Sequence, residues 1–382
     1  MAEDDAIHVR GLCWVVFAYD IGMAIDLARA RALLDRALEP SIQKEGERHT
    51  RRAPKYFEFR PAPVRVTRSI EPLKLATCQT LPVADCTLYD FGAITVTYMV
   101  RADGPLEGLL GLSEDLYESR VLLDASRRLV ETVLAEVRSA VNRPALAPPV
   151  EDYAIYRLRL VDGAGVPVGG PIRPVLERHA GTLAKVLRAD RQELSEQEVR
   201  DAMSCQLSYT PEDAAIIDWN AAILFLEESE DVRSVLEFAN VELLEMRQLD
   251  DQLDVAMEHS YQALTRPARR GVIGRLMPGA SGAELRRVAE LQMDSSLLFE
   301  NVSNALKLLG DQYLARVYRL AAGRLHLPDW DASILRKLSV LESIYEKLAD
   351  RQGADRMELL EWIVIVLIAL EIVLNFVPGI HG

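Results

Sequence analysis

Cysteines are few in this chain, and none stands at the spacing that metal or redox sites use. Cys13, Cys78, Cys86 and Cys205 are scattered through 382 residues without a Cys-x-x-Cys pair. They lie in apolar or strand-like segments, where reduced cysteines pack as small core residues. This pattern argues against a disulfide framework and favours a reducing compartment, and we expect neither a metal site nor a cofactor.

The chain also lacks the motifs that would name a reaction. It has no Gly-x-Ser-x-Gly elbow and no His-Glu-x-x-His pair. The glycines of residues 163–170 match neither a phosphate loop nor the GxGxxG pattern. Glu258 and His259 are adjacent, so they point to different faces of a helix, unlike the Glu-x-x-His of di-iron bundles. Whether the protein is an enzyme stays open, with a non-enzymatic role favoured.

Basic residues are outnumbered by acidic ones, so the formal net charge of the chain is -14. Nucleic-acid binding draws mainly on Lys and Arg, so this balance argues against nucleic acid as a direct partner. The local exception is a segment whose basic residues are Arg266, Arg269, Arg270, Arg275, Arg286 and Arg287. These arginines would bind anionic lipid headgroups or RNA phosphates, or they belong to an ordinary solvated loop.

No basic, cleavable leader opens the sequence. The acidic residues Glu3, Asp4 and Asp5 precede the apolar run of residues 11–18, where a secretory signal would carry Lys or Arg. We interpret this run as a buried strand.

One long apolar run, LLEWIVIVLIALEIVLNFV, occupies residues 359–377. As a helix it would extend about 28 Å, close to the roughly 30 Å of a bilayer's hydrocarbon core. Arg351 and Arg356 precede the run and no Lys or Arg follows it, so the positive-inside rule places the bulk of the chain in the cytoplasm. We predict a single-pass membrane protein held in lipid by residues 357–378. The alternative is a buried core helix of a soluble oligomer.

Two polar residues argue against full exposure of this helix to lipid. Glu371 and Asn375 are four residues apart and share one helix face. An acidic group at depth in a bilayer costs roughly 3 kcal/mol. Either this face meets a partner helix or a second copy of the chain, or Glu371 is protonated or reaches toward the far interface.

The chain before residue 228 has the pattern of a duplication. A Cys-Gln pair precedes the strand-like YDFGAITVTYMV at Tyr89, and a second one precedes IDWNAAILFL at Ile217. Each copy opens with a strand-like segment and has a helical stretch before its Cys-Gln pair. We predict two α/β units, residues 1–142 and 150–227, each with a small mixed or antiparallel sheet, joined by a proline-containing linker.

Long helices are predicted after residue 227, because apolar stripes run along residues 228–264 and 283–320. A third helix carries a coiled-coil repeat of Ile334, Leu338, Leu341, Tyr345 and Leu348. Residues 228–356 are predicted to form a helical hairpin or coiled-coil stalk, which packs within one chain or makes a homo-oligomer. The predicted fold class is therefore α+β, with two α/β units, this stalk and one C-terminal transmembrane helix.

Asp90 and Asp218 occupy equivalent positions in the two copies, each followed by an aromatic residue. If the copies face each other, the two side chains would be paired carboxylates in a crevice between the units. The alternative is that each aspartate begins a hairpin turn, where Asp bonds to its own backbone.

Three segments resemble the "required for meiotic nuclear division" family. They are YDFGAITVTYMV from Tyr89, VLEFANVELLEMRQLDDQLD from Val235 and ELLEWIVIVLIALEIVL from Glu358. The resemblance covers about the last third of the chain and one strand. It implies an α/β region, a helical stalk and a C-terminal membrane helix, and a role near translation at the inner membrane for mitochondrial relatives. It implies no active-site residue.

Two functions follow from these observations. The first is a non-enzymatic, membrane-anchored scaffold or binding protein, whose α/β head binds a protein or nucleoprotein partner. It is favoured because no complete catalytic constellation is present. The second is a membrane-bound enzyme that acts on a phosphorylated or nucleotide substrate between the two units, near Asp90 and Asp218.

Overall fold

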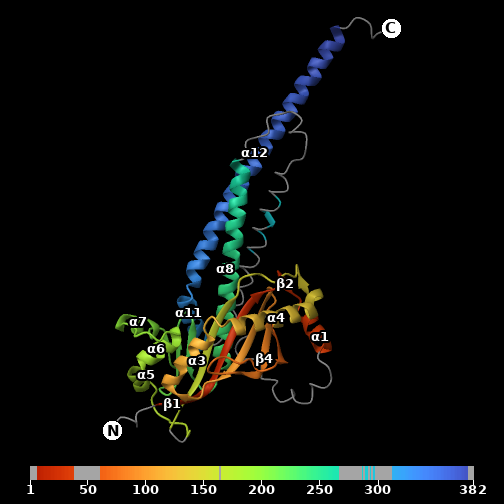
Figure 1. Cartoon of the computed structure of the whole chain (residues 1–382). Helices are drawn as coiled ribbons and strands as arrows, with labels where there is room; N and C mark the ends of the chain where they lie inside the picture. Colours follow the sequence, from red (N-terminus) through yellow and green to blue (C-terminus); the bar gives the residue numbers. More distant parts are fainter. Residues whose placement is uncertain are drawn as a thin grey trace. The chain divides into compact units, whose positions relative to one another are not determined.

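The computed structural model describes residues 7–37, 61–162, 165–265 and 312–376, and residues 286, 289, 290, 293 and 296. The chain divides into two compact units (Figure 1). Unit 1 comprises residues 1–248 and 300–329, and unit 2 comprises residues 249–299 and 330–382. The division falls inside one long helix, between Gln248 and Leu249.

Unit 1 is built on a nine-stranded sheet. Its strands are β1 (His8–Asp20), β3 (Val64–Ser69), β4 (Thr80–Leu88), β5 (Ala93–Arg101), β6 (Gly104–Pro105), β8 (Glu151–Val161), β9 (Gln206–Leu207), β10 (Ala214–Ile217) and β11 (Ala221–Phe225). The spatial order is β3-β4-β5-β1-β8-β11-β10-β9, and β6 pairs with the start of β1. Neighbouring strands are antiparallel except β8 and β11, which are parallel. A separate two-stranded sheet joins β2 (Ala24–Ile25) to β7 (Val141–Asn142).

The prediction of two separate small sheets is wrong. β1 from the first predicted unit pairs along most of its length with β8 from the second, in a register that sets His8 opposite Val161 and Ala18 opposite Glu151. Two small sheets would each have left an edge strand with unpaired backbone N–H and C=O groups. Joining the two edges satisfies those groups and makes β1 and β8 the centre of one sheet.

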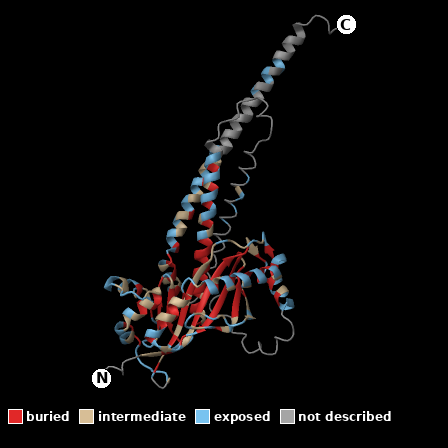
Figure 2. Cartoon of the chain, in the orientation of Figure 1, coloured by how far each residue is buried: buried red, intermediate tan, exposed pale blue. Residues whose placement is uncertain are grey.

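Helices with a buried apolar side cover one face of this sheet. They are α1 (Leu27–Ala37), α3 (Leu109–Leu116), α4 (Arg120–Val137), α5 (Arg173–Arg178), α6 (Ala180–Arg188) and α7 (Glu196–Ala202), with short 3-10 turns at Leu106–Gly108 and Arg138–Ala140. Alternate residues of β1, among them Val15 and Phe17, meet the buried stripe of α4, which includes Leu122 and Val130. This face holds the main apolar core. Figure 2 shows that the strands of the sheet are largely buried.

The other face of the sheet packs against α8 (Glu230–Thr265), and α11 (Gln312–Arg324) lies near β9 and β10. Ala18 of β1 and Ala93 of β5 belong to a second apolar cluster with Phe238 and Leu244 of α8. Residues 235–246 of α8 are all buried. A helix buried on every side is usually apolar all round, yet this stretch contains Glu237, Glu242 and Glu245.

Unit 2 contains the second part of α8 and most of α12 (Leu327–Phe376). Lys337 Nζ lies 2.8 Å from Asp250 Oδ1 and 2.5 Å from Asp254 Oδ1. Ser333 Oγ lies 3.4 Å from Asp250 Oδ1. Later residues of α12 thus contact later residues of α8, which means that the two helices run parallel. Leu253, Ile334 and Leu341 are buried within this unit. Self-association through this unit stays a prediction.

The predicted transmembrane helix, and the single-pass membrane localisation that depended on it, are wrong. Within the ranges that the structure describes, no helix has both the length and the apolar character that crossing a bilayer requires. The apolar run instead forms the end of the 50-residue helix α12. Glu361 and Glu371 interrupt it, and each acidic group in hydrocarbon would cost roughly 3 kcal/mol.

Candidate anion-binding site

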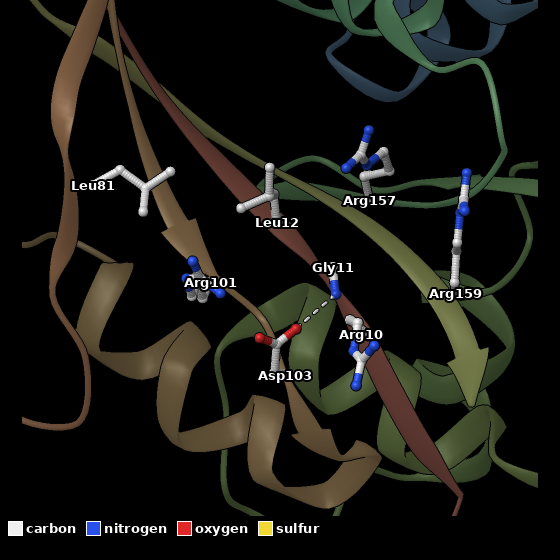
Figure 3. Close-up of a pocket in the computed structure, with 8 residues that line it drawn as sticks. All are labelled: Arg10, Gly11, Leu12, Leu81, Arg101, Asp103, Arg157 and Arg159. Atoms are coloured by element: carbon white, nitrogen blue, oxygen red, sulfur yellow. Dashed lines mark hydrogen bonds between the residues drawn. The ribbon is translucent and has the colours of Figure 1, made fainter. Parts of the chain in front are cut away.

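A pocket of about 660 Å³ opens in unit 1 where β1 begins and where β5 and β8 end (Figure 3). We call it the arginine pocket. Its lining residues are Arg10, Gly11, Leu12, Leu81, Arg101, Asp103, Arg157 and Arg159. The volume falls in the range of roughly 300–1,000 Å³ that is typical of small-molecule sites.

Strand register brings the four arginines to one face of the sheet. Arg10 of β1 stands opposite Arg159 of β8. Leu12, two residues further along β1, stands opposite both Arg157 of β8 and Arg101 of β5. Residues that are two apart on a strand, or directly opposite across strands, point to the same side. Three strands therefore supply one group of guanidinium side chains.

Gly11 allows β1 and β8 to approach closely at the floor of this pocket. A Cβ atom at this position would lie 1.9 Å from the carbonyl oxygen of Arg157, which is far inside van der Waals contact. The backbone N–H of Gly11 donates to Asp103 Oδ1 at 3.1 Å, the dashed line in Figure 3. The Asp103 carboxylate thus accepts a hydrogen bond from the backbone at the floor of the pocket.

Neighbouring groups hold the arginines in place. The Arg157 guanidinium lies 5.6 Å from the centre of the Trp14 ring, and the buried Arg233 of α8 lies over the same ring at 5.0 Å. An Arg10 nitrogen lies 2.6 Å from the position that a Cβ on Gly165 would take. Arg159 pairs with Glu227 at 3.4 Å, and both of these side chains are exposed.

The charge of the arginine pocket is strongly positive. Of the described residues that line it, four are arginines and Asp103 is the one acid. Like charges directly opposite each other in a sheet destabilise the strand pairing, so the Arg10–Arg159 pair has a cost for folding. Guanidinium groups bind phosphate and carboxylate oxygens with two parallel hydrogen bonds. An anion in this pocket would offset the repulsion.

Buried charges join α8 to the sheet next to Trp14, whose ring Arg157 of the pocket also contacts. Glu237 is fully buried; it accepts a hydrogen bond from Thr95 and lies 3.4 Å from Arg65 and 3.8 Å from Arg233. Arg233, also fully buried, lies 3.4 Å from Asp85. This network fixes the N-terminal turns of α8 near Trp14, the ring on which Arg157 packs.

Asp90 and Asp218 lie in the turns between β4 and β5 and between β10 and β11. Both turns are at the end of the sheet opposite the arginine pocket. β1 and β8 separate the two hairpins, and three inter-strand spacings amount to about 14 Å. The structure does not bring these two carboxylates together.

Each of the two aspartates has its own surroundings. Burial raises the pKa of Asp90. Asp218 is fully buried; it accepts hydrogen bonds from Arg188 at 3.2 Å and from Arg324 at 2.5 Å. Asp218 therefore ties its hairpin to α6 and α11.

The other predicted site residues are placed only in part. Arg286 is an exposed helical residue, whereas Arg266, Arg269, Arg270, Arg275 and Arg287 lie outside the described residues. Glu371 and Asn375 belong to α12, but their side chains lie outside the described ones. In the part of the chain that is described, no three His, Cys, Asp or Glu side chains gather as a metal site would require.

Sequence reasoning missed the arginine pocket. The alternation of Arg157 and Arg159 in RLR was a usable signal, because residues two apart on a strand share a face. Its partners Arg10 and Arg101 are about 60 to 150 positions distant in the sequence, so only the strand pairing brings them together.

Comparison with known proteins identifies the family. The family model described as the N-terminal domain of uncharacterized protein MJ0711 matches residues 10–231. The chain belongs to this family. The MJ0711 N-terminal domain thus includes every residue that lines the arginine pocket. The name of this family states no activity.

A relative from Methanocaldococcus jannaschii, "Uncharacterized protein MJ0711", is 24% identical over 202 residues. The alignment covers 52% of this chain and 60% of the relative, so the match spans somewhat more than half of that protein's length. No solved structure matches the chain. None of these findings tests the resemblance to the "required for meiotic nuclear division" family, which stays a prediction.

Proposed function

We propose that this protein is a non-enzymatic binding protein, a scaffold whose MJ0711 N-terminal domain holds an anionic partner in the arginine pocket. The observation that carries the proposal is the gathering of four arginines around one acid in a chain of net charge -14. The net negative charge of the protein repels polyanions at long range. An anionic partner is therefore bound at the basic pocket and not over the rest of the surface.

The chemistry of the pocket favours binding over catalysis. General acid–base chemistry needs a carboxylate or imidazole within reach of the reacting atoms. Asp103, the acid among the described lining residues, accepts the Gly11 N–H. The partner therefore offers phosphate, sulfate or carboxylate groups to the guanidinium side chains.

Retention on immobilised heparin, eluted with a salt gradient, tests this function. The variant Arg101→Glu/Arg159→Glu should elute at clearly lower salt than the wild type, because two of the four cations that hold the polyanion have been reversed. The control, Arg29→Glu/Arg31→Glu, makes the same change of net charge on the exposed surface of α1. We expect the control to elute close to the wild type. Equal shifts for the two variants would contradict the proposal.

A further inference from the structure

We infer that the arginine pocket binds a nucleoside polyphosphate, with the base against Leu12 and Leu81 and the phosphates against Arg10 and Arg159. This inference rests on the proposed function and names the ligand class of the same site. It combines three observations: an apolar wall, a cross-strand arginine pair and a cavity larger than a single phosphate needs.

The apolar wall comes from β1 and β4. Leu12 and Leu81 are both half-buried and both line the pocket. In Figure 3 they lie toward one side of the pocket, whereas Arg157 and Arg159 of β8 lie toward the other. A ligand without an apolar part would leave the side chains of Leu12 and Leu81 in contact with water. A planar heterocycle would cover the two leucines and gain from the apolar area that it buries.

The phosphate end is defined by Arg10 and Arg159. They stand directly opposite each other, and Cβ atoms at such positions are about 4.5–5.5 Å apart. Arg10 packs against the backbone at Gly165. Among the residues that the structure describes, Arg159 pairs with Glu227, and 86% of the glutamate side chain is accessible. Exposed pairs contribute little, so a phosphate chain can displace this carboxylate.

Arg157 and Arg101 contact the middle of the ligand. They stand directly opposite Leu12 on β5 and β8. Because β5 lies between β4 and β1, Arg101 is between the strands of the two leucines, and Arg157 is on the other side of Leu12. Arg157 is oriented by the Trp14 ring. Two further cations at this point match a ligand with several negative charges. The volume of about 660 Å³ also exceeds what inorganic phosphate fills and suits a nucleotide-sized molecule.

Calorimetric titration of the full-length protein in EDTA tests the inference with ATP, inorganic tripolyphosphate and AMP as probes. ATP should bind about tenfold more tightly than tripolyphosphate, because only ATP covers the two leucines. AMP should bind more weakly than ATP, because it lacks the charges that engage Arg10 and Arg159.

Substitutions separate the two ends of the site. Arg159→Gln should weaken ATP and tripolyphosphate alike by about tenfold, the loss expected for a hydrogen bond to a charged group. Leu12→Gln and Leu81→Ser should each weaken ATP but not tripolyphosphate. The control Arg31→Gln, an exposed change on α1, should alter neither. Melting curves would show whether each variant is folded. If one of the two leucine variants is unfolded, the other one tests the apolar wall.

The outcomes distinguish this inference from the proposed function. If tripolyphosphate binds as tightly as ATP, or if ATP binding ignores Arg159 and both leucines, the nucleotide inference is overturned. If neither probe binds while heparin retention still depends on Arg101 and Arg159, the inference falls and the function stands. If neither probe binds and retention is also unchanged, both are overturned.

Discussion

Asp20 shows at the scale of one residue how burial creates a response to pH. It ends β1, where its Oδ1 accepts the Gly22 N–H at 2.8 Å and its Oδ2 accepts a hydrogen bond from Gln248. Burial raises the pKa of Asp20 from 3.8 to about 6. Burial, and then the charge of Asp20, raise the pKa of the fully buried Glu245. The two carboxylates thus resist ionisation in the folded protein.

The sign of the pH effect follows from these shifts. Between about pH 4 and pH 6 the unfolded chain loses its proton from Asp20 while the folded protein keeps it. The free energy of unfolding therefore falls as the pH rises through this window. We predict that Asp20→Asn flattens this dependence and raises the free energy of unfolding at pH 7 by roughly 1–2 kcal/mol.

Urea denaturation at several pH values would measure the effect. Asp124→Asn, an exposed change on α4, is the matched control and should keep the wild-type dependence. The same pH profile for Asp20→Asn and for the wild type would show that Asp20 is not the titrating group. Gln248 Oε1 has no hydrogen bond in the described part of the structure, so the Gln248 amide can turn to accept from the amide that replaces the Asp20 carboxylate.

At the scale of elements, α8 depends on a buried charge network rather than on an apolar stripe alone. Arg233 and Glu237 are one turn apart and fully buried. Between them they reach Asp85 of β4, Thr95 of β5 and Arg65 of β3. Removing one partner of such a network leaves a buried charge with fewer opposite charges around it, which costs more than the pair contributes when intact.

We predict that Glu237→Leu lowers the free energy of unfolding by about 3–5 kcal/mol, because Arg233 and Arg65 lose their shared carboxylate. The double variant Arg233→Met/Glu237→Leu should lose clearly less than the sum of the two single losses, because it removes opposite charges together. Urea denaturation of the two single variants and the double variant measures this coupling. Strictly additive losses would show that the two side chains do not act as one network.

At the scale of the whole molecule, α11 completes unit 1 although it follows a long intervening segment of the chain. Arg324 of α11 donates to Asp218 at 2.5 Å and to Asp201 at 2.6 Å. Tyr318 of the same helix donates to Glu242 of α8 at 2.6 Å. Residues 300–329 are accordingly grouped with residues 1–248.

This grouping predicts the result of two truncations. A chain that ends at residue 329 keeps the contacts of α11 with Asp218, Asp201 and Glu242 and should unfold with the stability of the intact unit 1. A chain that ends at residue 311 leaves the buried Asp218 without Arg324 and should lose about 3 kcal/mol or more. Urea denaturation followed by circular dichroism compares the two chains. Equal stabilities would show that α11 does not belong to unit 1.

Local signals allowed much of the secondary structure to be predicted. The apolar run of residues 11–18 is confirmed as part of β1, and the helix predicted over residues 228–264 is confirmed as α8. Asp90 and Asp218 lie in hairpin turns, as one of the two interpretations held. Alternation along a strand, the 3.6-residue period of a helix and turn chemistry all depend on residues that are near in the sequence.

By itself, then, the sequence determined where strands, helices and turns form, and which of their side chains are apolar. Only the tertiary structure decided that β1 pairs with β8, that Arg10, Arg101, Arg157 and Arg159 share one pocket, and that charged residues of α8 are buried. The physical reason is that strand register is set by backbone hydrogen bonds between distant segments. Such pairing leaves no periodic trace in either segment alone, so the alternation of Arg157 and Arg159 could not show that Arg10 and Arg101 lie beside them.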